Sequence, residues 1–413
     1  MYLKKISIKN IGCIDELEIE FKQFAGWHVL IGDNGAGKST ILQAIALALV
    51  GNNKIEALRL AYAQLIRFGE ERGEIELKVK LCDAPDYIYG RLRGINFERS
   101  SRNGIPTAVI TRKNNSDLTD DKIGFAASFG PFRRFSGGNK EWETLYTSYP
   151  KVAAHLSVFG EDVALTESIE WLVRLNYKKL ERDSLSAYTL KNLKKFINES
   201  NLLPQHVSLE QISSEGVTFK DGNGVLISVT EMSDGFRSVL SLTFELIRQL
   251  VFTFGAKEVF QNIEKGEINI NIPGVVLIDE IDAHLHPTWQ TRIGQSLTAY
   301  FPAIQFIVTT HSPLVCRAAE KGSIWRLTAP GSNQETYEIL SVERDRLIYG
   351  NILEAIGTSS FGNNVERSEK SKEMLQKLSN LEVQHTYGKL TKEEIIQMNN
   401  LRKIFTTDDT INL

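Results

Sequence analysis

Cysteine is scarce in this chain, and long apolar runs are missing from it. The 413 residues include three cysteines, Cys13, Cys82 and Cys316, and none belongs to a Cys-x-x-Cys pair. This spacing argues against a disulfide framework and a thiolate zinc site, and it suits a reducing compartment. No run of about 18 apolar residues predicts a membrane span, and the N-terminus MYLKKISIKN lacks the apolar core of a signal peptide. We therefore expect a cytoplasmic protein without a membrane partner.

A strong excess of charge is also lacking. The formal net charge is −3 at pH 7, which provides no global attraction to nucleic acid. The charge is uneven, because residues 91–134 carry nine Lys/Arg and four Asp/Glu, a local balance of +5. In the stretch FAASFGPFRRFSGG, residues 125–138, Arg133 and Arg134 are candidates for contact with a nucleic-acid backbone or a partner protein. A solvated basic surface loop is the alternative interpretation.

The order of periodic segments predicts an α/β fold. Apolar and polar residues alternate as in β-strands over much of the first 115 residues, apart from an Ala-, Ile- and Leu-rich helix after the first motif. Helical periodicity then takes over, and α/β units follow it. The patterns divide the chain into a strand-rich part at 1–140, an inserted helical lobe at 141–205, a second α/β part at 206–342 and a helical tail at 343–413.

The stretch IGDNGAGKST, residues 31–40, matches the phosphate-loop pattern Gly-x-x-x-x-Gly-Lys-[Ser/Thr]. It follows the strand-like run WHVLI and precedes a helix, which is the context that such a loop requires. Glycines permit the backbone to wrap phosphates, Lys38 supplies a positive charge, and Ser39 offers a hydroxyl to Mg²⁺. The residues assigned to nucleotide binding are Gly32, Asn34, Gly35, Gly37, Lys38, Ser39 and Thr40.

Two later strands end in residues that suit the same site. The apolar run VVLI predicts a buried parallel strand that ends at Asp279 and Glu280, and the next strand, in AIQFIVTTHSP, ends at His311. The carboxyl ends of parallel strands face one crevice. We predict that Asp279 holds Mg²⁺ together with Ser39, and that Glu280 orients and deprotonates an attacking water. His311 is placed to contact the γ-phosphate.

A fourth motif, EMSDGFRSVLSLTFELIRQL at 231–250, predicts a long amphipathic helix capped by Ser233. A helix start with a hydroxyl and a small residue, here Gly235, can bind an anion. Taken alone, the motif is equally consistent with an ordinary capped helix.

These four motifs, in this order, resemble the ABC-type ATPase head that SMC proteins, the recombination mediator RecF and OLD-family ATPases share. The resemblance covers about 1–82 and 206–327. It implies an ABC ATPase head with a mixed N-terminal β-sheet, a mostly parallel phosphate-loop sheet flanked by helices, an inserted compact helical lobe and a helical C-terminal tail. It also implies ATP and Mg²⁺ as cofactors and the hydrolysis of ATP to ADP and phosphate.

The same resemblance implies a dimer or higher oligomer. SDGFR resembles the signature motif LSGGQ, which acts in trans, so that Ser233 and Gly235 of one subunit close over the γ-phosphate bound by Lys38 of another. DAHLHP resembles the D-loop, and His311 resembles the switch histidine. Asp234 stands where many relatives have glycine. No Q-loop glutamine is visible, and we place the coupling loop at 125–138.

The chain lacks the effector parts of several relatives. Residues 141–205 show no sustained heptad, so we expect a compact lobe and not a coiled coil. Residues 343–413 offer no Asp-x-Asp of an OLD nuclease domain, and no His-Asn-His nuclease constellation is visible, so we predict no intrinsic nuclease. The whole-chain pattern resembles the standalone ATPases of bacterial anti-phage operons, namely the Septu and retron-associated ATPases.

That resemblance implies control or scaffolding of a separately encoded effector, an HNH-type nuclease or another toxin. The tail has apolar faces at helical spacing, which predict either docking of that partner or packing onto the head of the same chain. A RecF-like DNA-binding ATPase of DNA repair and a scaffold stabilised by nucleotide are the alternative functions.

Overall fold

The computed structural model describes residues 1–50, 55–58, 60–81, 91–102, 105–114, 124–133, 150–160, 166–203, 207–328, 331, 335–351, 355, 369–387 and 390–405. It forms two compact units, Met1–Gly350 and Asn351–Leu413. The boundary follows helix α11 (Ser341–Tyr349), which the sequence analysis placed in the tail. Leu347 and Ile348 of α11 are buried, so this helix packs as part of the first unit.

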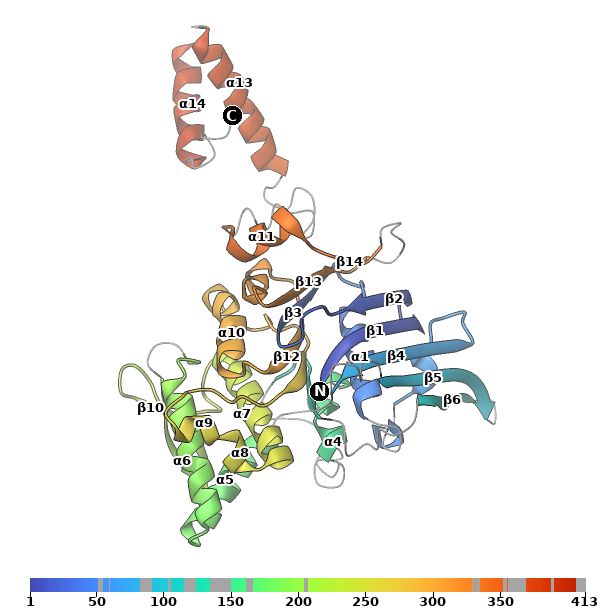
Figure 1. The fold of residues 1–413 in the computed structure, drawn as a ribbon. Helices are drawn as coiled ribbons and strands as arrows, with labels where there is room; N and C mark the ends of the chain where they lie inside the picture. Colours follow the sequence, from blue (N-terminus) through green and yellow to red (C-terminus); the bar gives the residue numbers. More distant parts are fainter. Residues whose placement is uncertain are drawn as a thin grey trace. The chain divides into compact units, whose positions relative to one another are not determined.

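A six-stranded sheet of the first unit has the order β14-β13-β3-β12-β11-β7. Figure 1 labels β14, β13, β3 and β12 of this sheet. All neighbouring strands are parallel except the edge strand β14. The strands are β3 (Gly26–Ile31), β7 (Phe125–Phe129), β11 (Gly274–Ile278), β12 (Ile304–Thr310), β13 (Gly322–Arg326) and β14 (Tyr337–Glu338). The strands β3, β11 and β12 are buried along their whole length and mostly apolar, because strands buried on both faces need no polar alternation. Strand β7 occupies the start of the expected coupling loop.

A second sheet of five antiparallel strands has the order β2-β1-β4-β5-β6. Its strands are β1 (Tyr2–Ile11), β2 (Ile14–Glu20), β4 (Arg72–Lys80), β5 (Arg91–Arg102) and β6 (Ile105–Asn114). The alternation in β1 puts Ile6 and Ile8 in the core, and Lys9 on the other face pairs with Glu16 of β2 at 2.7 Å. A smaller antiparallel sheet joins β8 (Ser208–Ser213), β9 (Gly216–Lys220) and β10 (Leu226–Ser228).

Helix α1 (Lys38–Val50) is buried on nearly all sides, as its composition predicts. One hydrophobic core joins it to Ile8 of β1, Leu277 of β11 and Ile307 of β12. The helix therefore packs between the two sheets, and each fully buried Ile or Leu contributes about 1.5–3 kcal/mol. This packing positions the phosphate loop, which begins α1.

A buried glutamine also joins the two sheets. Gln305 of β12 accepts the Leu3 N–H at 2.7 Å and donates to the Leu3 carbonyl at 3.0 Å. Both polar ends of this side chain are therefore satisfied, as burial requires.

The first unit contains further helices, several of which are labelled in Figure 1. They are η1 (Ile55–Leu58), α2 (Tyr62–Leu65), α4 (Pro150–Ala153), η3 (Leu156–Val158), α5 (Thr166–Leu180), α6 (Ser184–Glu199), α7 (Asp234–Phe254), α8 (Ala256–Val259), α9 (Gln261–Glu264), α10 (Pro287–Tyr300) and η4 (Pro313–Ala318). The expected helical lobe is not uniform, since Val152 and Leu156 belong to the core around α1, whereas α5 and α6 pack on each other. Together these elements confirm the α/β class.

The second unit is a helical hairpin of α13 (Glu369–Thr386) and α14 (Lys392–Ile404). Leu378 and Leu381 of α13 pack against Met398 and Leu401 of α14. Thr391 begins α14 with a reciprocal capping box. The apolar face predicted for 393–405 therefore packs on α13 within the hairpin. The apolar face predicted for 346–356 begins instead in α11, in the first unit.

Candidate functional site

The phosphate loop runs from the end of β3 into α1, as predicted. Gly35 and Gly37 have φ values of +81° and +86°, which favour glycine. A Cβ at Gly37 would lie 3.0 Å from Cys13 Sγ, so a side chain there would also have to displace this neighbour slightly. Asn34 and Gly35 are exposed, and Ser39 and Thr40 are half-buried at the helix start. The loop thus presents backbone N–H groups and hydroxyls at a helix N-terminus, which suits phosphate.

Lys38 folds over this loop. Its Nζ donates to the carbonyls of Gly32 at 2.8 Å and Asp33 at 3.1 Å. Burial lowers the pKa of Lys38, and the negative charges of Glu280 and Asp279 oppose that shift. A buried ammonium surrounded by carbonyls and facing carboxylates fits a site for an anionic nucleotide with a divalent cation.

The two acidic residues follow β11 directly. Asp279 is 3% exposed, and its carboxylate accepts the Thr309 hydroxyl at 2.5 Å. The same Thr309 oxygen accepts the Glu280 N–H at 2.8 Å. Glu280 has a φ of +45°, which is uncommon for a non-glycine residue. Thr309 thus organises both acids, and sequence reasoning missed it, although it belongs to the Thr-Thr-His run that ends β12.

Strand order brings the predicted residues to one edge. Strand β12 lies between β3 and β11, and the pairs Thr310–Ile31 and Val308–Ile278 align their carboxyl ends. The phosphate loop, Asp279 and Glu280 and His311 therefore emerge side by side. His311 is exposed directly after β12. A phosphate loop, two acidic residues and a histidine therefore lie together at this edge, a combination that suits phosphoryl transfer.

The segment that resembles the D-loop, DAHLHP at 282–287, contacts the end of β12. Thr310 donates its hydroxyl hydrogen to the Asp282 carboxylate at 2.5 Å, and Ser312 donates to Gln290 of α10 at 2.7 Å. His286 is the N-cap of α10, where its ring accepts the Thr288 N–H at 3.4 Å. A structural capping role therefore accounts for this histidine.

The signature segment begins α7. Ser233 is the N-cap residue, but its side chain makes no capping hydrogen bond and is exposed. Asp234 pairs with Arg237 one turn later. A Cβ at Gly235 would lie 3.0 Å from the His284 carbonyl, so the helix start lies directly against the D-loop. The Ser233 hydroxyl is therefore not used for capping its own helix.

Arg133 corrects one prediction. Its side chain is 5% exposed and donates all its N–H groups to protein acceptors, so the predicted contact of Arg133 with nucleic acid is wrong. Arg134 lies outside the described residues, as does Cys82.

A cavity of about 660 Å³ adjoins the phosphate loop. Its lining includes Ala36 of that loop, Cys13 and Ile14 of the first hairpin, and Leu327 and Thr328 after β13. This volume lies in the range of small-molecule sites.

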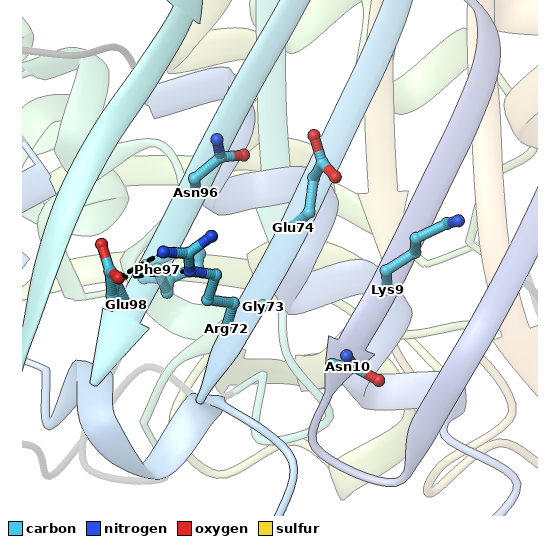
Figure 2. A pocket seen from close by; sticks show the side chains of 8 residues that line it. All are labelled: Lys9, Asn10, Arg72, Gly73, Glu74, Asn96, Phe97 and Glu98. Atoms are coloured by element: carbon cyan, nitrogen blue, oxygen red, sulfur yellow. Dashed lines mark hydrogen bonds and ion pairs between the residues drawn. The ribbon is translucent and has the colours of Figure 1, made fainter. Parts of the chain in front are cut away.

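A second cavity, of about 450 Å³, lies on the five-stranded sheet. Figure 2 shows Lys9, Glu74 and Asn96 projecting from three adjacent strands, with Arg72 paired to Glu98 at 2.8 Å. Charges of both signs therefore line this cavity.

Across the described helices, none is long and apolar enough to cross a membrane.

Residues 28–317 match the family described as "AAA domain, putative AbiEii toxin, Type IV TA system". The chain belongs to this family. It is similar to the Septu protein PtuA of Bacillus mycoides, with 29% identity over 330 residues that cover 78% of this chain and 40% of that protein. It is also similar to the Retron Vc95 probable ATPase of Vibrio cholerae, with 24% identity over 409 residues, covering 80% of this chain and 76% of that protein.

The Retron Ec83 probable ATPase of Escherichia coli is 39% identical over 129 residues, which cover 31% of this chain and 21% of that protein. The chain therefore spans less than half the length of this relative and of the Bacillus mycoides protein. Among solved structures, an SMC head bound to the C-terminal winged-helix domain of ScpA has a TM-score of 0.50 at 18% identity, covering 83% of this chain and 99% of that chain. These relatives and this fold confirm the expected ABC-type ATPase head.

Proposed function

We propose that this protein binds ATP with Mg²⁺ and hydrolyses the bond between its β- and γ-phosphates, which releases ADP and phosphate. The observation that carries the proposal is that the carboxyl ends of β3, β12 and β11 lie next to one another. There the negative charges of Asp279 and Glu280 act on the Lys38 ammonium. Families of this kind bind ATP with Mg²⁺.

In the proposed reaction, the phosphate loop and Lys38 bind the β- and γ-phosphates. Ser39 and Asp279 would hold Mg²⁺, which neutralises phosphate charge when bound. Glu280 orients a water molecule and accepts its proton, and His311 contacts the γ-phosphate. The cavity beside Ala36 receives the nucleoside, because it opens from the same loop.

The exposed start of α7 supports a proposed dimer or higher oligomer. Ser233 and Gly235 of a second copy would close over the nucleotide, and the Ser233 hydroxyl makes no capping bond within its own helix. A helix N-terminus that meets phosphate from another subunit would make assembly depend on ATP.

The ATPase proposal is tested by phosphate release from the purified protein and from Glu280→Gln. The amide cannot accept a proton, so this variant should bind Mg-ATP, lose about 100-fold or more in hydrolysis, and accumulate as a dimer by light scattering. Glu98→Gln, in the five-stranded sheet, is the matched control. Normal turnover by Glu280→Gln would remove Glu280 as the base.

The relatives support a proposed biological role. We propose that the ATPase scaffolds or restrains a separately encoded effector, an HNH-type nuclease or another toxin, in anti-phage defence, and that cutting is left to that partner. The hairpin α13–α14 is the proposed docking element, since it forms a compact unit with its own core.

Deleting residues 366–413 tests this assignment. Normal ATP turnover with lost co-purification of the product of a neighbouring gene would support docking by the hairpin. An inactive or insoluble head would show that the hairpin belongs to the ATPase core. Duplex DNA binding with a steep salt dependence would instead favour the RecF-like alternative.

A further inference from the structure

Arg133 lies at the centre of a buried hydrogen-bond cluster that the proposed mechanism does not use. The guanidinium has five N–H donors. They donate to Ser238 Oγ (Nε, 3.0 Å), to the carbonyls of Gly130 and Asp279 (Nη1, 3.0 and 2.8 Å) and to the carbonyls of Glu280 and Ile281 (Nη2, 3.0 and 3.4 Å). No donor is left for an external ligand.

Three of these acceptors are consecutive carbonyls of the turn that carries Glu280. Glu280 has a φ of +45°, and such conformations cost about 1–3 kcal/mol and persist where the surroundings impose them. Thr309 binds the Glu280 N–H, while Arg133 binds the Glu280 carbonyl. The backbone of the proposed base is therefore held from both sides.

The Nε donor reaches a different motif. Ser238 lies on α7 directly after the SDGFR segment and is 2% exposed. A single rigid guanidinium thus connects the turn of Glu280 with the helix that begins at Ser233. Burial lowers the pKa of Arg133 to about 10, and the charges of Asp279, Asp282 and Glu280 oppose this shift, so the group stays cationic near neutral pH.

We propose that Arg133 is a positioning residue for ATP hydrolysis, which holds Glu280 in its left-handed turn and couples that turn to the start of α7. This inference rests on the proposed role of Glu280. A displacement of the signature helix would then change the orientation of the base. Lysine cannot replace arginine here, because an ammonium has three donors and lacks the planar fork.

The test measures ATP affinity and single-turnover hydrolysis for Arg133→Lys, Arg133→Ala and Ser238→Ala. We expect ATP dissociation constants within about threefold of the wild type and hydrolysis at least about tenfold slower for both Arg133 variants. Added guanidinium ion should partly restore hydrolysis by Arg133→Ala, whereas methylammonium should not. Ser238→Ala should slow hydrolysis with little change in unfolding temperature.

Two matched controls isolate the effect. Arg99 of β5 also binds loop carbonyls, those of Ile66, Arg67 and Glu70, and Ser241 donates only to the Ser238 carbonyl of its own helix among the described contacts. Arg99→Lys and Ser241→Ala should hydrolyse ATP normally.

If the rate of hydrolysis falls in proportion to the unfolding temperature across all five variants, then Arg133 only stabilises the fold, and the inference is overturned. If Arg133→Lys does not fold, Ser238→Ala decides alone, and its normal turnover overturns the coupling. Normal turnover by Arg133→Lys with an inactive Glu280→Gln would refute this inference and leave the proposed function standing. Normal turnover by Glu280→Gln would refute this inference and remove Glu280 as the base, whereas a wild-type protein that releases no phosphate from ATP would refute the proposed function.

Discussion

Thr309 donates its hydroxyl hydrogen to the Asp279 carboxylate at 2.5 Å, and both residues are almost fully buried. The same hydroxyl oxygen accepts the Glu280 N–H. One side chain on β12 therefore forms hydrogen bonds with both acidic residues that follow β11. The pairing of these two neighbouring strands fixes where the acidic residues lie in the site.

Thr309→Val keeps the shape of this side chain and removes both hydrogen bonds. We expect ATP hydrolysis to slow about tenfold or more, since the Glu280 turn loses its N–H partner, while ATP binding changes little. Thr243→Val is the control, because the buried Thr243 hydroxyl donates to the Val239 carbonyl of its own helix. Equal kinetics for the two variants would refute the positioning role of Thr309.

Lys38→Ala removes the cation of the phosphate loop. We expect ATP affinity to fall about 100-fold or more, because the β- and γ-phosphates lose a charge-assisted partner. Isothermal titration calorimetry measures this loss, and Lys22→Ala, at an exposed ion pair with Glu338, is the control. Wild-type affinity in Lys38→Ala would rule out the phosphate-loop assignment.

Cys13 offers a probe of nucleotide position. It is exposed, lines the cavity beside the phosphate loop and would contact a side chain at Gly37. In a Cys82→Ser background, a thiol reagent should modify Cys13, and Mg-ATP should slow this modification severalfold. The buried Cys316 should not react, since burial raises its pKa. Modification at an unchanged rate with saturating Mg-ATP would place the nucleoside elsewhere.

His28 predicts a pH dependence of stability. Its ring is fully buried between Ser323 Oγ at 2.9 Å and the Phe24 carbonyl at 2.8 Å, and burial lowers its pKa to about 4. The unfolded chain, with a histidine pKa of about 6.5, binds more protons between these two values. Stability is therefore retained above pH 6.5 and lost as the pH falls toward 4.

Between pH 7.5 and pH 5, this single group should lower the free energy of unfolding by about 2 kcal/mol. Urea titrations of the wild type and His28→Gln at both pH values measure the difference, with the exposed His385→Gln as control. An identical pH dependence in the wild type and His28→Gln would contradict the assignment.

Much of the site is predictable from local sequence. The phosphate loop is a contiguous run of ten residues that stands between a strand and a helix, the context that the motif requires, and apolar runs predict buried parallel strands. Because the carboxyl ends of such strands meet at one edge, the sequence also predicts that Asp279, Glu280 and His311 lie near Lys38. The order β3-β12-β11 then agrees with that expectation.

The tail shows where such reasoning ends. Its helical periodicity predicts apolar stripes, and periodicity cannot tell which surface covers a stripe. Tertiary structure pairs Leu381 of α13 with Leu401 of α14 in one small core, whereas Leu347 of α11 packs in the first unit.

Arg133 shows the same limit in the site itself. By its own sequence it reads as a basic loop residue, because burying an unpaired guanidinium is strongly unfavourable. Its acceptors are Ser238, 105 residues away, and the carbonyls of the turn at Asp279, 146 residues away. The sequence alone determined the phosphate loop and the strands that carry the acids. Only the tertiary structure brought these distant acceptors together around one guanidinium, because the free energy of burying a charge depends on partners that folding assembles.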